Sequence, residues 1–175
     1  IDLHSFTELR KVVVGLSPTR LRLDDQKHLW VCCQGNYNQT APQVVVLQNE
    51  AVIQRILTPC SNISIQGTTA YVIDNEQNTL NTISTIDFAL SAFNFQQTPS
   101  FENPYGLLAT ADALYITDAK NYVSSGVLHC YSYDGREHWC AQTGDIPGRL
   151  CRVTGAYDIH GDTVPEPPKN SPYIT

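Results

Sequence analysis

A repeat of about 42 residues runs through this chain of 175 residues. Its first marker is a proline just ahead of a strand-like run, found at Pro18, Pro59, Pro104 and Pro147. Its second marker is an aromatic residue in the next strand-like run, found at Trp30, Tyr71, Tyr115 and Tyr157. The prolines are 41, 45 and 43 residues apart, and the aromatic residues are 41, 44 and 42 residues apart. Two independent markers that share one period predict stacked copies of a single structural unit.

Within each repeat the apolar residues alternate or form short runs, and clusters of Gly, Pro, Asn and Asp separate these runs. This pattern is typical of strands and turns rather than of helices. Four strands in about 42 residues match one blade of a β-propeller, a four-stranded sheet that buries its faces against neighbouring blades. The sequence therefore predicts an all-β fold with full blades over about 16–57, 58–96 and 100–142.

The two ends predict incomplete blades. Residues 1–15 resemble the outer two strands of one blade and residues 147–158 the inner strands of another, while 159–175 form a proline-rich tail unsuited to a central strand. Either the chain is part of a larger ring, or its ends join in a composite blade that closes a four-bladed ring. The start in the middle of a blade favours the larger ring. The chain contains no Met, so we expect a processed or excised segment.

Charge and composition exclude some classes of partner. The net charge is -6, and Lys and Arg are scattered, which argues against binding to nucleic acid or anionic lipid. No apolar run approaches the length of a membrane span. The six cysteines contain no C-x-x-C pair, and we expect most of them to be small buried apolar residues.

Two segments resemble known propellers. The opening IDLHSFTELRKVVVGLSP resembles the repeat of YncE-like, YVTN-type propellers. The later NPYGLLATADALYITDAKNYVSSGVLHCYSYDG is similar to the closing blades of exported propellers of Gram-negative bacteria, called surface-layer or quinoprotein-like proteins. The resemblance covers roughly residues 1–150.

The resemblance implies a ring of about seven blades in the periplasm or at the cell surface, often lipid-anchored, that acts by binding and needs no cofactor. One relative of this type captures corrinoids, so the implied partner is a small molecule, a glycan or another surface protein. Further blades or self-association would cover the open side of the chain. Two alternatives are a quinoprotein-like oxidoreductase and a structural surface-layer component.

Loops between the second and third strands of each blade share one rim with the loops that link successive blades, and binding residues concentrate on such loops. Amide, tyrosine and charged side chains there suit a ligand with many hydrogen-bonding groups and an apolar face. Alternatively, Asn and Gly only form the turns. The candidate ligand-binding residues are Asn36, Tyr37, Asn38, Asn75, Glu76, Tyr105, Asp118, Lys120, Asn121, Tyr122 and Arg149.

Two cysteine-containing groups are weaker candidates. If Asp134 and Gly135 form a two-residue hairpin loop, Tyr133 pairs with Arg136, Tyr131 with His138 and His129 with Cys140. His129, His138 and Cys140 then share one face, but no fourth ligand is evident, so we expect no metal there. Cys32 and Cys33 point to opposite faces of a strand, which disfavours a disulfide between them.

Overall fold

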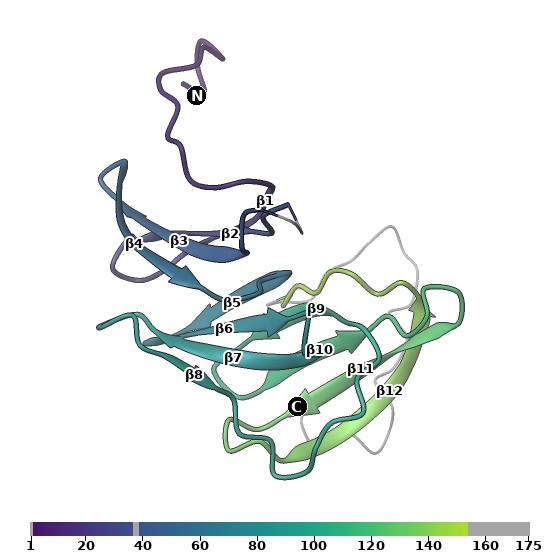
Figure 1. Cartoon of the computed structure of the whole chain (residues 1–175). Helices are drawn as coiled ribbons and strands as arrows, with labels where there is room; N and C mark the ends of the chain where they lie inside the picture. The colour runs from purple at the N-terminus through teal and green to yellow at the C-terminus, as the bar shows by residue number, and fades with distance from the viewer. Residues whose placement is uncertain (1, 37–38, 154–175) are drawn as a thin grey trace.

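The computed structural model describes residues 2–36 and 39–153, and this part of the chain forms strands, turns and loops without a helix. Its twelve strands build three antiparallel four-stranded sheets, and each sheet takes its strands in chain order (Figure 1). The prediction of an all-β fold is confirmed, and so is the four-stranded unit.

The bounds of the strands follow the repeat. The first sheet contains β1 (Pro18–Leu23), β2 (Leu29–Cys33), β3 (Gln43–Gln48) and β4 (Ala51–Leu57). The second sheet contains β5 (Asn62–Gln66), β6 (Thr69–Asp74), β7 (Thr79–Ser84) and β8 (Leu90–Ala92). The third sheet contains β9 (Pro104–Ala109), β10 (Leu114–Asp118), β11 (Ser125–Tyr131) and β12 (Glu137–Asp145).

The aromatic marker of the repeat has one structural role. Trp30, Tyr71 and Tyr115 lie on the second strands β2, β6 and β10. Trp30 packs against the second sheet and Tyr71 against the third. Tyr115 alternates with Leu114 and Ile116, which face the second sheet, so it lies on the outer face of the third sheet. The ring centroid of Trp139 is 6.1 Å from that of Tyr115 there.

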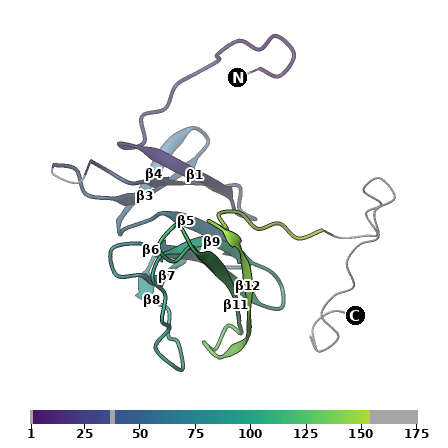
Figure 2. The same cartoon turned by 90° about the vertical axis from the view of Figure 1, so that its right-hand side faces the viewer.

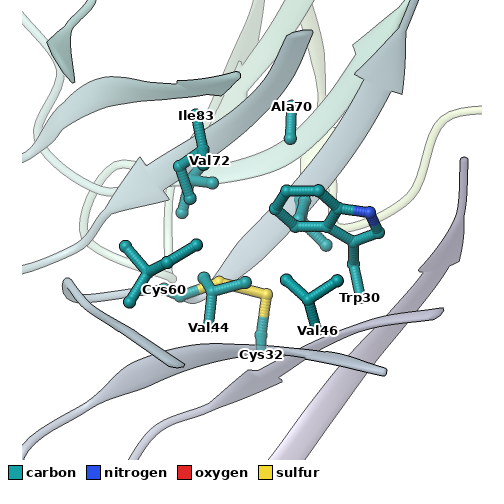
Figure 3. Close-up of a cluster of buried hydrophobic side chains, with 10 residues drawn as sticks. Trp30, Cys32, Val44, Val46, Cys60, Ala70, Val72 and Ile83 are labelled. Carbon is teal, nitrogen blue, oxygen red and sulfur yellow. A yellow bond between two sulfur atoms is a disulfide. The ribbon is translucent and has the colours of Figure 1, made fainter. Parts of the chain in front are cut away.

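The sheets pack face to face, with β1 beside β5 and β5 beside β9 (Figures 1 and 2). Alternating apolar residues of each strand therefore fill two interfaces. The core between the first and second sheets contains Trp30, Cys32, Val44, Val46, Ile56, Cys60, Ile63, Ala70, Val72 and Ile83 (Figure 3). The core between the second and third sheets is richer in aromatic rings, with Tyr71, Phe93, Phe101 and Tyr131.

A disulfide joins Cys32 of β2 to Cys60 in the connection between the first two sheets, with 5.6 Å between their Cα atoms (Figure 3). Strand alternation turns Cys32 toward the second sheet, where Cys60 lies, and turns Cys33 to the opposite face. The expectation that most cysteines are simple buried residues is therefore wrong. Only Cys33 and Cys130 are buried thiols, whereas Cys140 and Cys151 are exposed.

The segment before β1 differs from the expected outer strands of a blade at 1–15, because residues 2–17 form no strand. Val12 and Val14 instead lie over the outer face of the first sheet, against Val31, Val45 and Leu47. A segment that covers the face of a sheet has no strand edge to pair with, so its backbone makes no ladder.

After β12, residues 147–153 also form no strand, in contrast to the inner strands expected at 147–158. The hydroxyl of Thr117 donates to the carbonyl of Pro147, and this contact places the segment on the third sheet. Residues 154–158 and the expected tail at 159–175 lie outside the described residues.

The hairpin between β11 and β12 differs from the predicted two-residue loop. Gly135 donates to the carbonyl of Ser132, and Ser132 donates to the carbonyl of Arg136, so the loop has three residues and Gly135 takes a φ of 83°. His129 pairs with Cys140 as predicted, but Tyr131 pairs with Glu137 because the register skips His138. The extra residue is a bulge, which the predicted loop lacked.

Gly135→Ala is expected to destabilise the protein more than Gly67→Ala. Both glycines have a positive φ, which costs an alanine about 1–2 kcal/mol. A Cβ at Gly135 would also lie 1.9 Å from the carbonyl oxygen of Asn94, whereas a Cβ at Gly67 would meet nothing within 4 Å. Urea unfolding of the two variants measures the difference, and equal losses would contradict the docking of this hairpin against residues 94–96.

Candidate ligand site

One end of the three sheets collects the loops predicted to form a rim. The carboxylate of Asp118, at the end of β10, accepts hydrogen bonds from the backbone N–H groups of Glu102 and Asn103 in the connection before β9. In the second sheet, the Asn81 amide donates to Thr58 Oγ1 at 3.2 Å and to Asp74 Oδ2 at 3.3 Å. Connecting segments and second-to-third-strand loops therefore meet at the same end.

The two Asn-Tyr loops are built around their asparagines. Asn36 Oδ1 accepts from the backbone N–H groups of Gln39 and Thr40, and Asn121 Oδ1 accepts from those of Val123 and Ser124. Both amide oxygens are engaged in the turn that follows them, which favours the turn-forming alternative. Tyr37 and Asn38 lie outside the described residues.

The rim of the third sheet holds four further candidates. Asp118 is fully buried and thus out of reach of a ligand, whereas Lys120 Nζ lies 3.1 Å from its carboxylate and 3.5 Å from that of Glu102. Burial lowers the pKa of Lys120, but these two carboxylates outweigh it and raise that pKa. The rings of Tyr105 and Tyr122 meet edge to face, 5.8 Å apart. Of this group, Tyr122 offers the exposed surface.

A polar cavity of about 360 Å³ joins the rims of the first and second sheets. Asn75 and Glu76, both predicted, line it together with Gln34, Gln39 and Thr40. Its donors and acceptors suit a neutral hydroxylated ligand, but the described residues that line it include no cationic side chain.

A second cavity of about 360 Å³ lies where the first strands of the sheets adjoin. Arg20 and Arg22 of β1 also line it. They pair across the strands with Cys32 and Trp30 of β2, so they share the face of the first sheet that is turned toward the second sheet. Arg149 enters from the segment that follows β12 and passes close to β9 (Figure 2). The remaining lining residues are Thr19, Leu21, Asn62, Leu107, Gly148 and Leu150.

These three guanidinium groups carry uncompensated charge. Arg20 donates to the carbonyl of Thr19 and Arg22 to that of Leu21, but within residues 2–36 and 39–153 none of the three arginines forms an ion pair with a carboxylate. Burial, and then the charge of Arg20, lower the pKa of Arg22. An arginine remains protonated at neutral pH in spite of this. An anion in this cavity would relieve the repulsion and accept bidentate hydrogen bonds.

Tyr105 connects the elements that line this arginine cavity. Asn62 is buried, and its amide donates to the carbonyl of Tyr105 at 2.9 Å, which ties β5 to β9. Gly148 packs against the Tyr105 ring, so the segment that bears Arg149 is held at the same place. The cavity is thus lined from four parts of the chain: residues 19–22, Asn62, Leu107 and residues 148–150.

Arg149, one of the candidate ligand-binding residues, lines this cavity, whereas Arg22 and Asn62 were missed. The alternation of Arg20 and Arg22 on one strand was a usable signal, because residues two apart share a face. Arg22 lies within β1 rather than in a loop, so a prediction that considers only loops does not include it.

The architecture is that of stacked four-stranded β-sheets. No protein-family model matches the chain, and no curated protein matches it either. The YncE-like resemblance therefore stays a prediction. The described part of the chain also contains no helix with the length and apolar character of a membrane span.

Proposed function

We propose that this chain is a segment of an exported β-propeller that acts as a binding scaffold, and that its arginine cavity holds an anionic group of a glycan or small molecule. The observation that carries the proposal is the convergence of Arg20, Arg22 and Arg149 without a carboxylate partner among the described residues. Arginine is the side chain best suited to planar recognition of carboxylate, phosphate and sulfate.

Two observations support the ring. The aromatic markers point in one direction along the stack, so Tyr115 faces the position that a fourth sheet would occupy. The outer face of the first sheet is apolar, and Leu21 and Leu23 are exposed on it. A ring of about seven blades would bury both faces. An oxidising compartment, as in the periplasm or at the cell surface, agrees with the Cys32–Cys60 disulfide.

The test uses three anionic probes: inorganic phosphate, polygalacturonate and chondroitin sulfate, with neutral dextran as the uncharged comparison. At least one anion is expected to raise the thermal midpoint, because binding to the native state stabilises it. The double variant Arg20→Ala with Arg22→Ala removes two charge-assisted contacts of about 1.5–3 kcal/mol each, so affinity is expected to fall at least tenfold.

Arg136→Ala combined with Lys11→Ala is the matched control, since it also removes two positive charges, at exposed positions that do not line the arginine cavity. It is expected to leave affinity within about twofold. The proposal fails if no anion binds, or if the double variant binds as tightly as the parent chain. If the control lost as much affinity for the anion as the double variant, the effect would come from net charge and not from a specific site.

A further inference from the structure

His129, Glu137 and Cys140 form a cluster on the β11–β12 hairpin. Their donor atoms, an imidazole nitrogen, a carboxylate oxygen and a thiol sulfur, all lie within 4.8 Å of one another. His129 Nδ1 and Glu137 Oε1 are 2.6 Å apart. The three residues come from two neighbouring strands, so the sheet itself sets their spacing.

The bulge in β12 creates this cluster. Alternation along a regular strand would put His138 on the same face as Cys140. Because the ladder passes from the Cys130–Trp139 pair directly to the Tyr131–Glu137 pair, Glu137 takes that position instead. The metal candidate predicted from the sequence is therefore changed in one member, with a carboxylate in place of the second imidazole.

Neighbouring side chains hold the His129 imidazole in place. His129 is buried and lies between Phe101, whose ring centroid is 5.2 Å away, and Tyr131, whose ring is stacked at 6.2 Å. Its Nε2 atom is buried and makes no hydrogen bond within the described residues, whereas Nδ1 faces Glu137. Nδ1 is thus the nitrogen directed at the Glu137 carboxylate, while the imidazole ring contacts both aromatic rings.

We propose that His129, Glu137 and Cys140 bind one Zn²⁺ ion, with the fourth position open. Imidazole, thiolate and carboxylate are the ligands that zinc prefers, and the bond lengths of a tetrahedral site require donor atoms about 3.5 Å apart. In the structure His129 Nδ1 and Glu137 Oε1 are closer than this, and all three donor atoms lie within 4.8 Å of one another, so binding requires the exposed Glu137 and Cys140 side chains to rotate. On binding, the Cys140 thiol forms the zinc–sulfur bond and releases its proton to solvent.

The fourth position of the proposed zinc site opens toward a cavity. A cavity of about 410 Å³ is lined by His129 and Glu137 and by the loop 96–100. Water or a small donor ligand could occupy the fourth zinc position from this side. The site lies on the hairpin, away from the arginine cavity, and requires neither the anionic ligand nor the ring proposed above.

The test adds Co²⁺ and Zn²⁺ to the full chain under anaerobic conditions. Co²⁺ is expected to give a thiolate-to-metal charge-transfer band. Zn²⁺ is expected to displace the bound Co²⁺, which removes the band, and to raise the thermal midpoint of the protein. Cys140→Ser is expected to abolish the band, and Glu137→Gln to weaken zinc affinity about 10-fold to 100-fold. Both changes are at exposed positions, so the fold is expected to persist.

Two controls separate the site from general metal binding. Cys151→Ser removes the other exposed thiol, and His138→Gln removes the imidazole that the bulge excludes. Both are expected to keep the band and an affinity within twofold of the parent chain. The proposal is overturned if the parent chain gives no thiolate band, if the band depends on Cys151, or if Cys140→Ser and Glu137→Gln both leave zinc affinity unchanged.

Discussion

Replacing Cys32 and Cys60 together by alanine is expected to lower the free energy of unfolding by about 3–4 kcal/mol, the chain-entropy value for a closed loop of this length. The disulfide spans 28 residues and connects β2 to the segment that enters the second sheet. Without it, the unfolded chain regains the freedom that the cross-link removes. Both cysteines are fully buried in the first core, so the shorter side chains also leave a small void.

Cys33→Ala is the matched control for the disulfide variant. Cys33 is adjacent in sequence and equally buried, but it is a free thiol on the opposite face of β2. Its loss is expected to cost about 1 kcal/mol, as for removal of a small buried group. Urea unfolding with and without strong reductant measures both effects. The assignment is contradicted if reductant leaves the midpoint of the parent chain unchanged, or lowers that of the double variant as much.

The repeat in the sequence predicted the three sheets because period and strand alternation are local properties. Trp30, Tyr71 and Tyr115 occupy equivalent strands, and each faces the next position along the stack. The disulfide was not predictable in the same way. Its partners are 28 residues apart, and only the packing of one sheet on another brings Cys60 to Cys32.

The hairpin at Asp134 shows how a small local ambiguity changes a candidate site. An Asp-Gly pair fits a two-residue loop, and it also fits a type I turn followed by a glycine with positive φ. The second geometry occurs, with Gly135 at a φ of 83°. Because the register of β12 skips His138, Glu137 lies beside His129 and Cys140 in the place where His138 was predicted. Sequence alone does not choose between these loops, because both satisfy the same dipeptide.

The arginine cavity depends on long-range packing. Arg20 and Arg149 lie near opposite ends of the described chain, and they meet because β1, β5 and β9 adjoin. The loops that looked richest in functional groups turned out to use them internally, as Asn36 and Asn121 do. The asparagines of these turns therefore fix the backbone geometry, and ligand contact by the same loops stays a prediction.

Asp118→Ala is expected to lower the free energy of unfolding by about 3–5 kcal/mol, the cost of removing one partner from a buried charged network. The carboxylate accepts from the backbone N–H groups of Glu102, Asn103 and Lys120, and the ammonium group of Lys120 lies 3.1 Å away. Alanine would leave the partly buried backbone N–H groups of residues 102 and 103 without this acceptor. Asp112→Ala, at an exposed position, is expected to stay within about 0.5 kcal/mol of the parent chain.

The same carboxylate predicts how stability depends on pH. Burial raises the pKa of Asp118, but the three backbone donors and Lys120 outweigh it, so its pKa lies below the ordinary value. A group with a depressed folded-state pKa stabilises the fold above its unfolded pKa of about 3.9, and this contribution disappears as pH falls through the folded value. The free energy of unfolding of the Asp118→Asn variant is therefore expected to fall less steeply with decreasing pH than that of the parent chain. Identical acid profiles would mean that this carboxylate does not hold the connection before β9 to the end of β10.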